Sequence, residues 1–258
     1  MKLSIKISLL AAILLVIHGC GDENKQQAQS TQAPTPIANA APAQAPGTAP
    51  PKPVAQPQAT TKPAATSRVP IGSGFDFYVL SLSWSPSYCL AKGADSDPAQ
   101  CLSSKPFDFI VHGLWPQNER GYPERCRSQD YPNREQIRSI SDITPSAGLV
   151  RHEWEKHGGC SGLSVDDYFE VMHQARARVN MPAQFVLPRQ DFALAPNAIE
   201  TAFIRANPGL NTVAISTACS RGDLSEVRIC LTKDLAFHPC PEVDRDACRS
   251  NLVTIPAP

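Results

Sequence analysis

Eight cysteines after residue 71 constrain the fold of this chain more than any other feature of its sequence. An even number of cysteines in an exported domain predicts a framework of disulfides, and here we expect four. The spacing alone does not choose among the many ways of pairing them. No two form a Cys-x-x-Cys pair, which argues against zinc ribbons and thioredoxin-like redox chemistry. The eight are Cys89, Cys101, Cys126, Cys160, Cys219, Cys230, Cys240 and Cys248.

The N-terminal segment predicts export. Lys2 and Lys6 precede an apolar run over residues 9–17 that is too short to span a bilayer as a stable helix. The run ends in Ile-His-Gly followed by Cys20, which resembles the lipobox of bacterial lipoproteins. We therefore expect residues 1–20 to be a lipoprotein-type signal peptide, with Cys20 lipidated and anchoring the protein in the cell envelope, on its periplasmic or extracellular face. An ordinary secretory signal with an incidental cysteine is the alternative.

Residues 21–70 contain no Phe, Trp or Tyr and consist mainly of Ala, Pro, Gln and Thr. Such a composition cannot bury enough apolar surface to offset the entropy lost on ordering. We expect a disordered, extended tether that holds the rest of the chain away from a membrane.

Residues 71–258 have the size of one domain. They contain 18 Lys and Arg against 22 Asp and Glu, a net charge of −4. The overall charge therefore does not indicate nucleic-acid binding, and any affinity for a polyanion must come from a local cationic site.

The pattern of apolar residues and breakers predicts an α+β fold with a mainly antiparallel sheet flanked by helices, because strands and helices do not alternate strictly. Asn133 and Ser164 are expected helix N-caps, and Gly158-Gly159 an expected helix end. The predicted strands cover residues 75–84, 108–115, 211–217 and 224–232, and the predicted helices cover residues 133–143, 145–157, 164–180 and 198–206.

Two short stretches, residues 109–116 and 152–160, concentrate the reactive side chains. In a helix, positions i, i+1, i+4 and i+5 share one half of the surface, so the side chains at 152, 153, 156 and 157 can converge on one site. His112 would reach that site from a neighbouring strand. A zinc protease motif would need His at position 156, where this chain has Lys156.

Two histidines suit a base and an acid, since free His titrates near about 6.5. Cleavage of RNA by its own 2′-OH needs a base at that hydroxyl and an acid at the 5′-oxygen. It also needs positive charge at the phosphoryl oxygens. The residue types in the two stretches therefore point to cleavage of RNA without a metal or another cofactor.

Residues 84–89, 112–116 and 152–160 resemble the conserved segments of the ribonuclease T2 family, and with the late cysteines the likeness covers nearly all of residues 72–258. The resemblance implies the ribonuclease T2-like fold and a monomeric endoribonuclease. Such an enzyme forms 2′,3′-cyclic phosphates and then 3′-phosphate ends, with low base specificity and a preference for single-stranded RNA.

The roles implied by the resemblance fall on seven residues of this chain. The general base would be His157 and the general acid His112, while Glu153 and Lys156 would stabilise the transition state and His152 would hold the phosphate. Trp115 would stack on a base. Gln117 stands where the family often has Asp, and its amide can still hydrogen-bond a base.

The resemblance also implies the disulfide pairing Cys89–Cys101, Cys126–Cys160, Cys219–Cys248 and Cys230–Cys240. Two other functions remain open from the sequence. One is a non-catalytic binding member of the family, which should lack a catalytic histidine, whereas both are present here. The other is a cell-envelope interaction protein that uses the domain as a scaffold.

Overall fold

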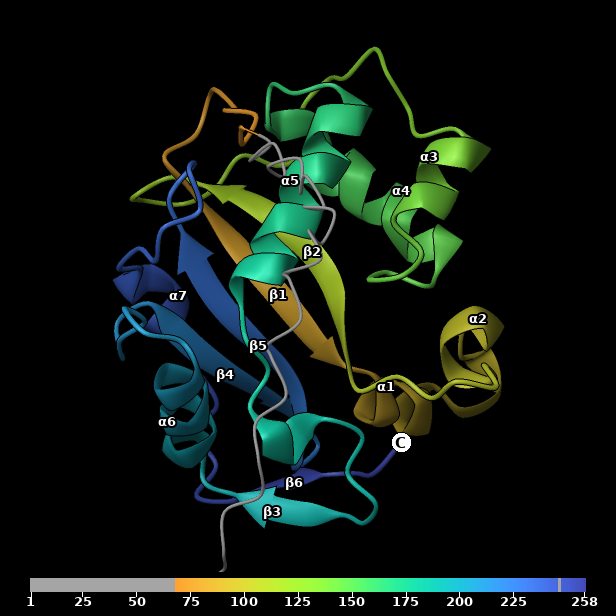
Figure 1. Ribbon diagram of the computed structural model, residues 1–258, viewed down its shortest axis with the longest axis vertical. Helices are drawn as coiled ribbons and strands as arrows, with labels where there is room; N and C mark the ends of the chain where they lie inside the picture. The colour runs from red at the N-terminus through yellow and green to blue at the C-terminus, as the bar shows by residue number, and fades with distance from the viewer. Residues whose placement is uncertain (1–67, 246) are drawn as a thin grey trace, which may run out of the picture. The chain divides into compact units, whose positions relative to one another are not determined.

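The computed structural model describes residues 68–245 and 247–258, so the predicted signal peptide, Cys20 and nearly all of the tether lie outside the described residues. The described part contains a sheet in the order β2-β1-β5-β6-β3, with β4 also paired to β5 (Figure 1). All pairs are antiparallel except β5 with β6, which confirms the predicted α+β class. The strands are β1 (Phe77–Trp84), β2 (Phe109–Gln117), β3 (Phe192–Leu194), β4 (Ile215–Ser220), β5 (Asp223–Leu231) and β6 (Val253–Ile255).

Helices α3 (Arg134–Ser139) and α5 (Val165–Arg178) begin at the predicted capping residues. Asn133 Oδ1 accepts hydrogen bonds from the backbone of α3, and Ser164 Oγ does the same for α5, as predicted. None of the described helices is long and apolar enough to cross a membrane. The helices are α1 (Ser85–Lys92), α2 (Pro98–Cys101), α3 (Arg134–Ser139), α4 (Ala147–Lys156), α5 (Val165–Arg178), α6 (Pro196–Ala206) and α7 (Pro241–Arg245).

Strand β1 separates two apolar clusters because its side chains alternate between the faces of the sheet. Tyr78, Leu80, Leu82 and Trp84 enter the main core, which also contains the apolar face of α5. Val79 points to the other face, in a small cluster with Phe77, Cys230 and Cys240. This second face is only partly covered by apolar side chains, which leaves room for polar groups.

A β-bulge in β2 decides where His112 points. Ser81 pairs with Gly113 and Leu82 pairs with Val111, so His112 is an extra residue without a partner on β1. Val111 and Leu114 both remain in the main core, which regular alternation would not allow. The bulge therefore turns His112 away from the core, toward the second face.

All four disulfides connect the cysteines that the resemblance pairs. The bonds are Cys89–Cys101, Cys126–Cys160, Cys219–Cys248 and Cys230–Cys240. The second bond ties the loop after β2 to the turn that follows α4, close to His157.

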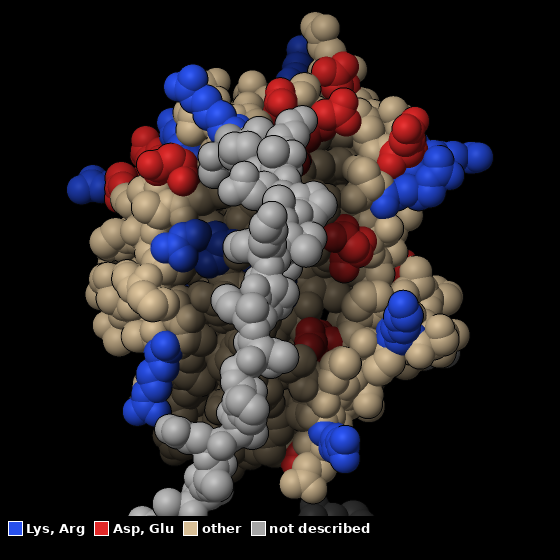
Figure 2. All heavy atoms as spheres, in the orientation of Figure 1, with Lys and Arg blue, Asp and Glu red and all other residues tan. Residues whose placement is uncertain are grey.

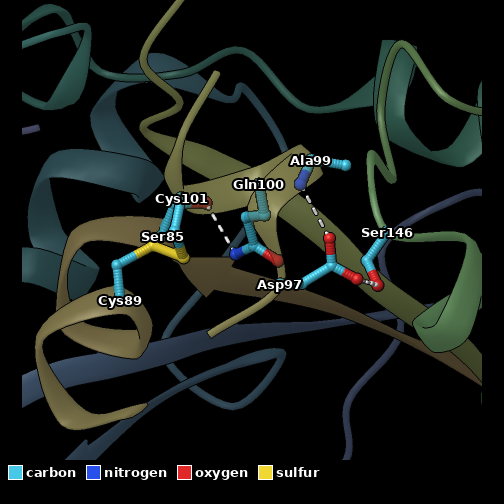
Figure 3. Close-up of a disulfide and its surroundings, with 7 residues drawn as sticks. All are labelled: Ser85, Cys89, Asp97, Ala99, Gln100, Cys101 and Ser146. Carbon is cyan, nitrogen blue, oxygen red and sulfur yellow. Dashed lines mark hydrogen bonds between the residues drawn. A yellow bond between two sulfur atoms is a disulfide. The ribbon is translucent and has the colours of Figure 1, made fainter. Parts of the chain in front are cut away.

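The segment closed by Cys89–Cys101 supports the start of α4 (Figure 3). Asp97 accepts a hydrogen bond from the backbone N–H of Ala99, which caps α2, and its second oxygen accepts one from Ser146 Oγ at 2.5 Å. Ser146 in turn accepts from the backbone N–H of Leu149 and is the N-cap of α4. A negatively charged acceptor near the first turn of a helix also interacts favourably with the helix dipole.

We predict that Ser146→Ala lowers the free energy of unfolding by about 1–2 kcal/mol, because it removes both the cap of α4 and the partner of Asp97. Urea denaturation followed by circular dichroism measures the change. Ser139→Ala, which removes an exposed hydroxyl from α3, is the matched control and should cost less than about 0.5 kcal/mol. Equal free energies of unfolding for the two variants would contradict a stabilising role of Ser146 at the start of α4.

Candidate active site

The second face of the sheet carries a cleft with a volume of about 550 Å³ between β1, β2, β5 and the end of α4. The structure brings all seven predicted site residues to this cleft, although they come from two segments some 40 residues apart. They are His112, Trp115, Gln117, His152, Glu153, Lys156 and His157.

Glu153 joins α4 to β2. Glu153 is only 4% exposed, and its Oε2 accepts a hydrogen bond from Trp115 Nε1 at 2.6 Å. A Cβ at position 113 would lie 2.2 Å from that carboxylate oxygen and 2.5 Å from Trp115 Nε1. Gly113 is therefore required for space, because any side chain there would separate Trp115 from Glu153.

His112 lies between two carboxylates. Its Nδ1 is 2.8 Å from Glu226 Oε1, and its Nε2 is 3.4 Å from Glu153 Oε1. Burial by itself would lower the pKa of His112, but the two carboxylates outweigh burial and raise it to about 9. Below that pH the imidazole is charged and can donate a proton.

His157 has the opposite protonation preference. The residue is 5% exposed, and its Nδ1 has no hydrogen-bond partner among the described residues. Burial lowers the pKa of His157 to about 4, and the positive charges of Lys156 and His112 act in the same direction. At neutral pH this imidazole is uncharged and can accept a proton.

Trp115 lies between the two histidines. Its ring centroid is 5.7 Å from that of His112 and 5.2 Å from that of His157, and the guanidinium of Arg228 lies 5.4 Å from the ring. The indole is therefore next to both histidines. Its predicted role, stacking on a base of the substrate, remains a prediction.

The cleft also contains residues that were not predicted from the sequence. Among them, Glu226 and Arg228 lie on β5, and Tyr122, which is 54% exposed, lies in the loop after β2. The first two carry a signal in the sequence, because two charged residues at alternate positions of one strand face the same side. The loop residue carries no comparable signal.

The domain has a net charge of −4, so positive charge in the cleft must come from a few side chains. On the face shown in Figure 2, acidic and basic side chains are interspersed. Within residues 68–245 and 247–258, no group of three or more His, Cys, Asp or Glu side chains could hold a metal ion. The positive charge available in the cleft belongs to Lys156, Arg228 and charged His112.

Comparison with known proteins gives several relatives. A ribonuclease of Aeromonas hydrophila is 46% identical over 111 residues, which are 43% of this chain and 49% of that protein, so the alignment spans about half of that relative. Ribonuclease DdI of Dictyostelium discoideum is 29% identical over 202 residues, 69% of this chain and 83% of that protein. The solved structure of an RNase-related protein from Calystegia sepium superposes with a TM-score of 0.55 at 21% identity, covering 71% of this chain and 98% of that one, which supports the fold.

The model of the ribonuclease T2 family matches residues 75–240, a range that includes β1, β2, α4 and β5 and therefore every cleft residue named above. The match, the four disulfides and the arrangement of the two histidine segments agree with one another. This chain belongs to the ribonuclease T2 family.

Proposed function

We propose that this protein is an endoribonuclease that cleaves RNA through attack by the 2′-OH on the adjacent phosphorus. The observation that carries the proposal is the pair of histidines in one cleft whose surroundings drive their pKa values apart, His112 to about 9 and His157 to about 4. Two titratable groups held in opposite protonation states at neutral pH are the resting form of a general acid and a general base.

In the proposed reaction, neutral His157 takes the proton from the 2′-OH while the 2′-oxygen forms a bond to phosphorus. The bond from phosphorus to the 5′-oxygen breaks, and charged His112 gives its proton to that oxygen. The products are a 2′,3′-cyclic phosphate and a 5′-OH end. Water can then open the cyclic phosphate to a 3′-phosphate, with the two histidines in exchanged roles.

Two side chains of α4 are available to contact the phosphate. Lys156 and His152 both line the cleft, and we assign them to the phosphoryl oxygens, where negative charge increases in the transition state. Burial alone would raise the pKa of Glu153, but its contacts with His112 and Trp115 hold it below its usual range, so it is a carboxylate. We therefore expect Glu153 to act on the transition state through His112.

The base of the substrate has room beside Trp115, Gln117 and the exposed ring of Tyr122, which line the same cleft. An aromatic ring stacks on any base with an energy of about 1–3 kcal/mol, so we propose low base specificity. Stacking needs an unpaired base, which favours single-stranded RNA. We propose that the enzyme acts as a monomer, because all seven assigned residues come from one chain.

We also propose that the domain is exported and held in the cell envelope by a lipid on Cys20. The four disulfides support an oxidising compartment. The lipobox-like ending of the apolar N-terminal run supports lipidation.

We predict that the protein cleaves single-stranded RNA in EDTA and leaves 2′,3′-cyclic phosphate ends, because the attacking group belongs to the substrate and no step needs a metal ion. Mass spectrometry of the termini identifies the products. DNA of the same sequence lacks the 2′-OH and should stay intact. Cleavage that depends on a divalent metal, or hydrolysis of the DNA, would refute the mechanism.

We predict that His112→Ala and His157→Ala each lower kcat at least about 100-fold, the usual contribution of one acid or base. In the wild-type enzyme, kcat/KM should rise with pH as His157 loses its proton near about 4 and fall as His112 loses its proton near about 9. His173→Ala, on α5 and paired with Asp142, is the control and should keep full activity. Near-normal turnover of either catalytic variant would remove that histidine from the mechanism.

We predict that Cys20→Ser moves the protein from the membrane fraction to the soluble fraction of the producing bacterium, because the acyl chains can no longer be attached. Fractionation followed by immunoblotting measures the distribution, and labelling with a radioactive fatty acid identifies the modified protein. A variant that stays in the membrane fraction to the wild-type extent would exclude lipidation as the anchor.

A further inference from the structure

We propose that Glu226, held by Arg228, is the positioning residue that fixes the ring of His112 and keeps its reactive nitrogen directed into the cleft. The inference deepens the proposed function, on which it rests. It concerns a residue outside both histidine-containing stretches, contributed by a third segment of the chain.

The geometry assigns each atom of the pair. Glu226 Oε1 lies 2.8 Å from Nδ1 of His112, a hydrogen-bond distance. With Nδ1–H donating to Glu226, the nitrogen left for the substrate is Nε2, on the side of Glu153. A carboxylate that accepts from one ring nitrogen fixes both the orientation of the ring and the position of its proton.

Arg228 keeps Glu226 in place and in its charged form. The other carboxylate oxygen, Oε2, accepts from Arg228 Nε at 2.9 Å and from its Nη2 at 2.8 Å. The Glu226 side chain is 12% exposed, so its orientation is set by these contacts more than by water. Burial alone would raise the pKa of Glu226, but His112 and Arg228 lower it to about 2, so the proton stays on the imidazole.

Charged and titratable groups flank His112 in two clefts. In the first, α4 contributes Glu153, Lys156 and His157, and β5 contributes Glu226 and Arg228. In the second, the groups beside His112 and Glu226 are Tyr88, Arg221 and Asp223. Glu226 makes the shorter of the two carboxylate contacts, 2.8 Å against 3.4 Å for Glu153. The other oxygen of Glu153 accepts from Trp115, whereas the other oxygen of Glu226 contacts only Arg228 among the described residues. Removal of the charge at 226 should therefore affect His112 directly.

The decisive variant is Glu226→Gln, which keeps the size of the side chain and removes its charge. Its single amide oxygen can accept from His112 or from Arg228, but it cannot serve both in the present geometry. Proton NMR of the His112 ring in the absence of RNA gives the titration directly, with the signal assigned by its loss in His112→Ala. We expect the His112 midpoint to fall by about one pH unit or more.

The matched control is Glu155→Gln, which removes the same charge from an exposed position of α4 where the carboxylate faces Arg125. We expect it to move the His112 midpoint by less than about 0.3 unit, because solvent screens exposed charges.

Arg228→Gln tests the partner of Glu226 in the ion pair. Loss of its positive charge should raise the midpoint, a direction that general loosening of the fold would not produce.

Activity provides a separate measurement. In Glu226→Gln the alkaline limb of kcat/KM should move to lower pH by the same amount, which means about tenfold less activity on that limb for one unit. The acid limb, which reports His157, should stay in place. Glu226→Ala should in addition lower the plateau, because the ring of His112 loses its orientation.

An unchanged His112 titration in Glu226→Gln would overturn the inference, and so would a fall of the midpoint in Arg228→Gln. If Glu226→Gln fails to fold, as judged by circular dichroism, the upward shift in Arg228→Gln still decides the matter. If the wild-type protein does not cleave RNA, the proposed function fails. The NMR titrations would still establish whether Glu226 controls His112.

Discussion

The carboxylate of Glu153 is the interaction on which the rest of the site depends. It is buried at the end of α4, accepts the indole N–H of Trp115 on β2 and approaches His112 on the same strand. A buried charge of this kind is stable only with hydrogen-bond partners. The helix and the strand are thus held in one relative position by a group that also sets the charge state of the site, and Gly113 provides the space for it.

The bulge at His112 and the burial of His157 give these two histidines different surroundings in one cleft. The bulge carries His112 out of the apolar core to a position between two carboxylates, while His157 sits beside Trp115 with little exposure to water. The same side-chain type therefore supplies both a proton donor and a proton acceptor. Because the two side chains are chemically identical, the difference between their pKa values arises from their surroundings.

Most of the architecture could be predicted from the sequence, because it follows from local signals. The caps at Asn133 and Ser164 and the long apolar strands were read correctly, and the resemblance supplied the disulfide pairing. Helix α1, which follows the predicted strand over residues 75–84 directly, was not predicted, although Pro86 is favoured in a first helical turn. The short strands β3 and β6 were not predicted, because they form through pairing between distant segments. For the same reason, neither the bulge at His112 nor its contact with Glu226 could be derived from spacing.

The separated proton affinities of the two histidines have a consequence for the cycle of the proposed enzyme. After one cleavage the proton sits on His157, which holds it weakly, and is missing from His112, which holds it strongly. Exchange with solvent water can restore the starting arrangement without any further chemistry on the product. The proposed enzyme can therefore release a cyclic phosphate and begin again, so that chain scission is not tied to the opening of the ring. An accumulation of cyclic ends during digestion would be the visible trace of this self-resetting site.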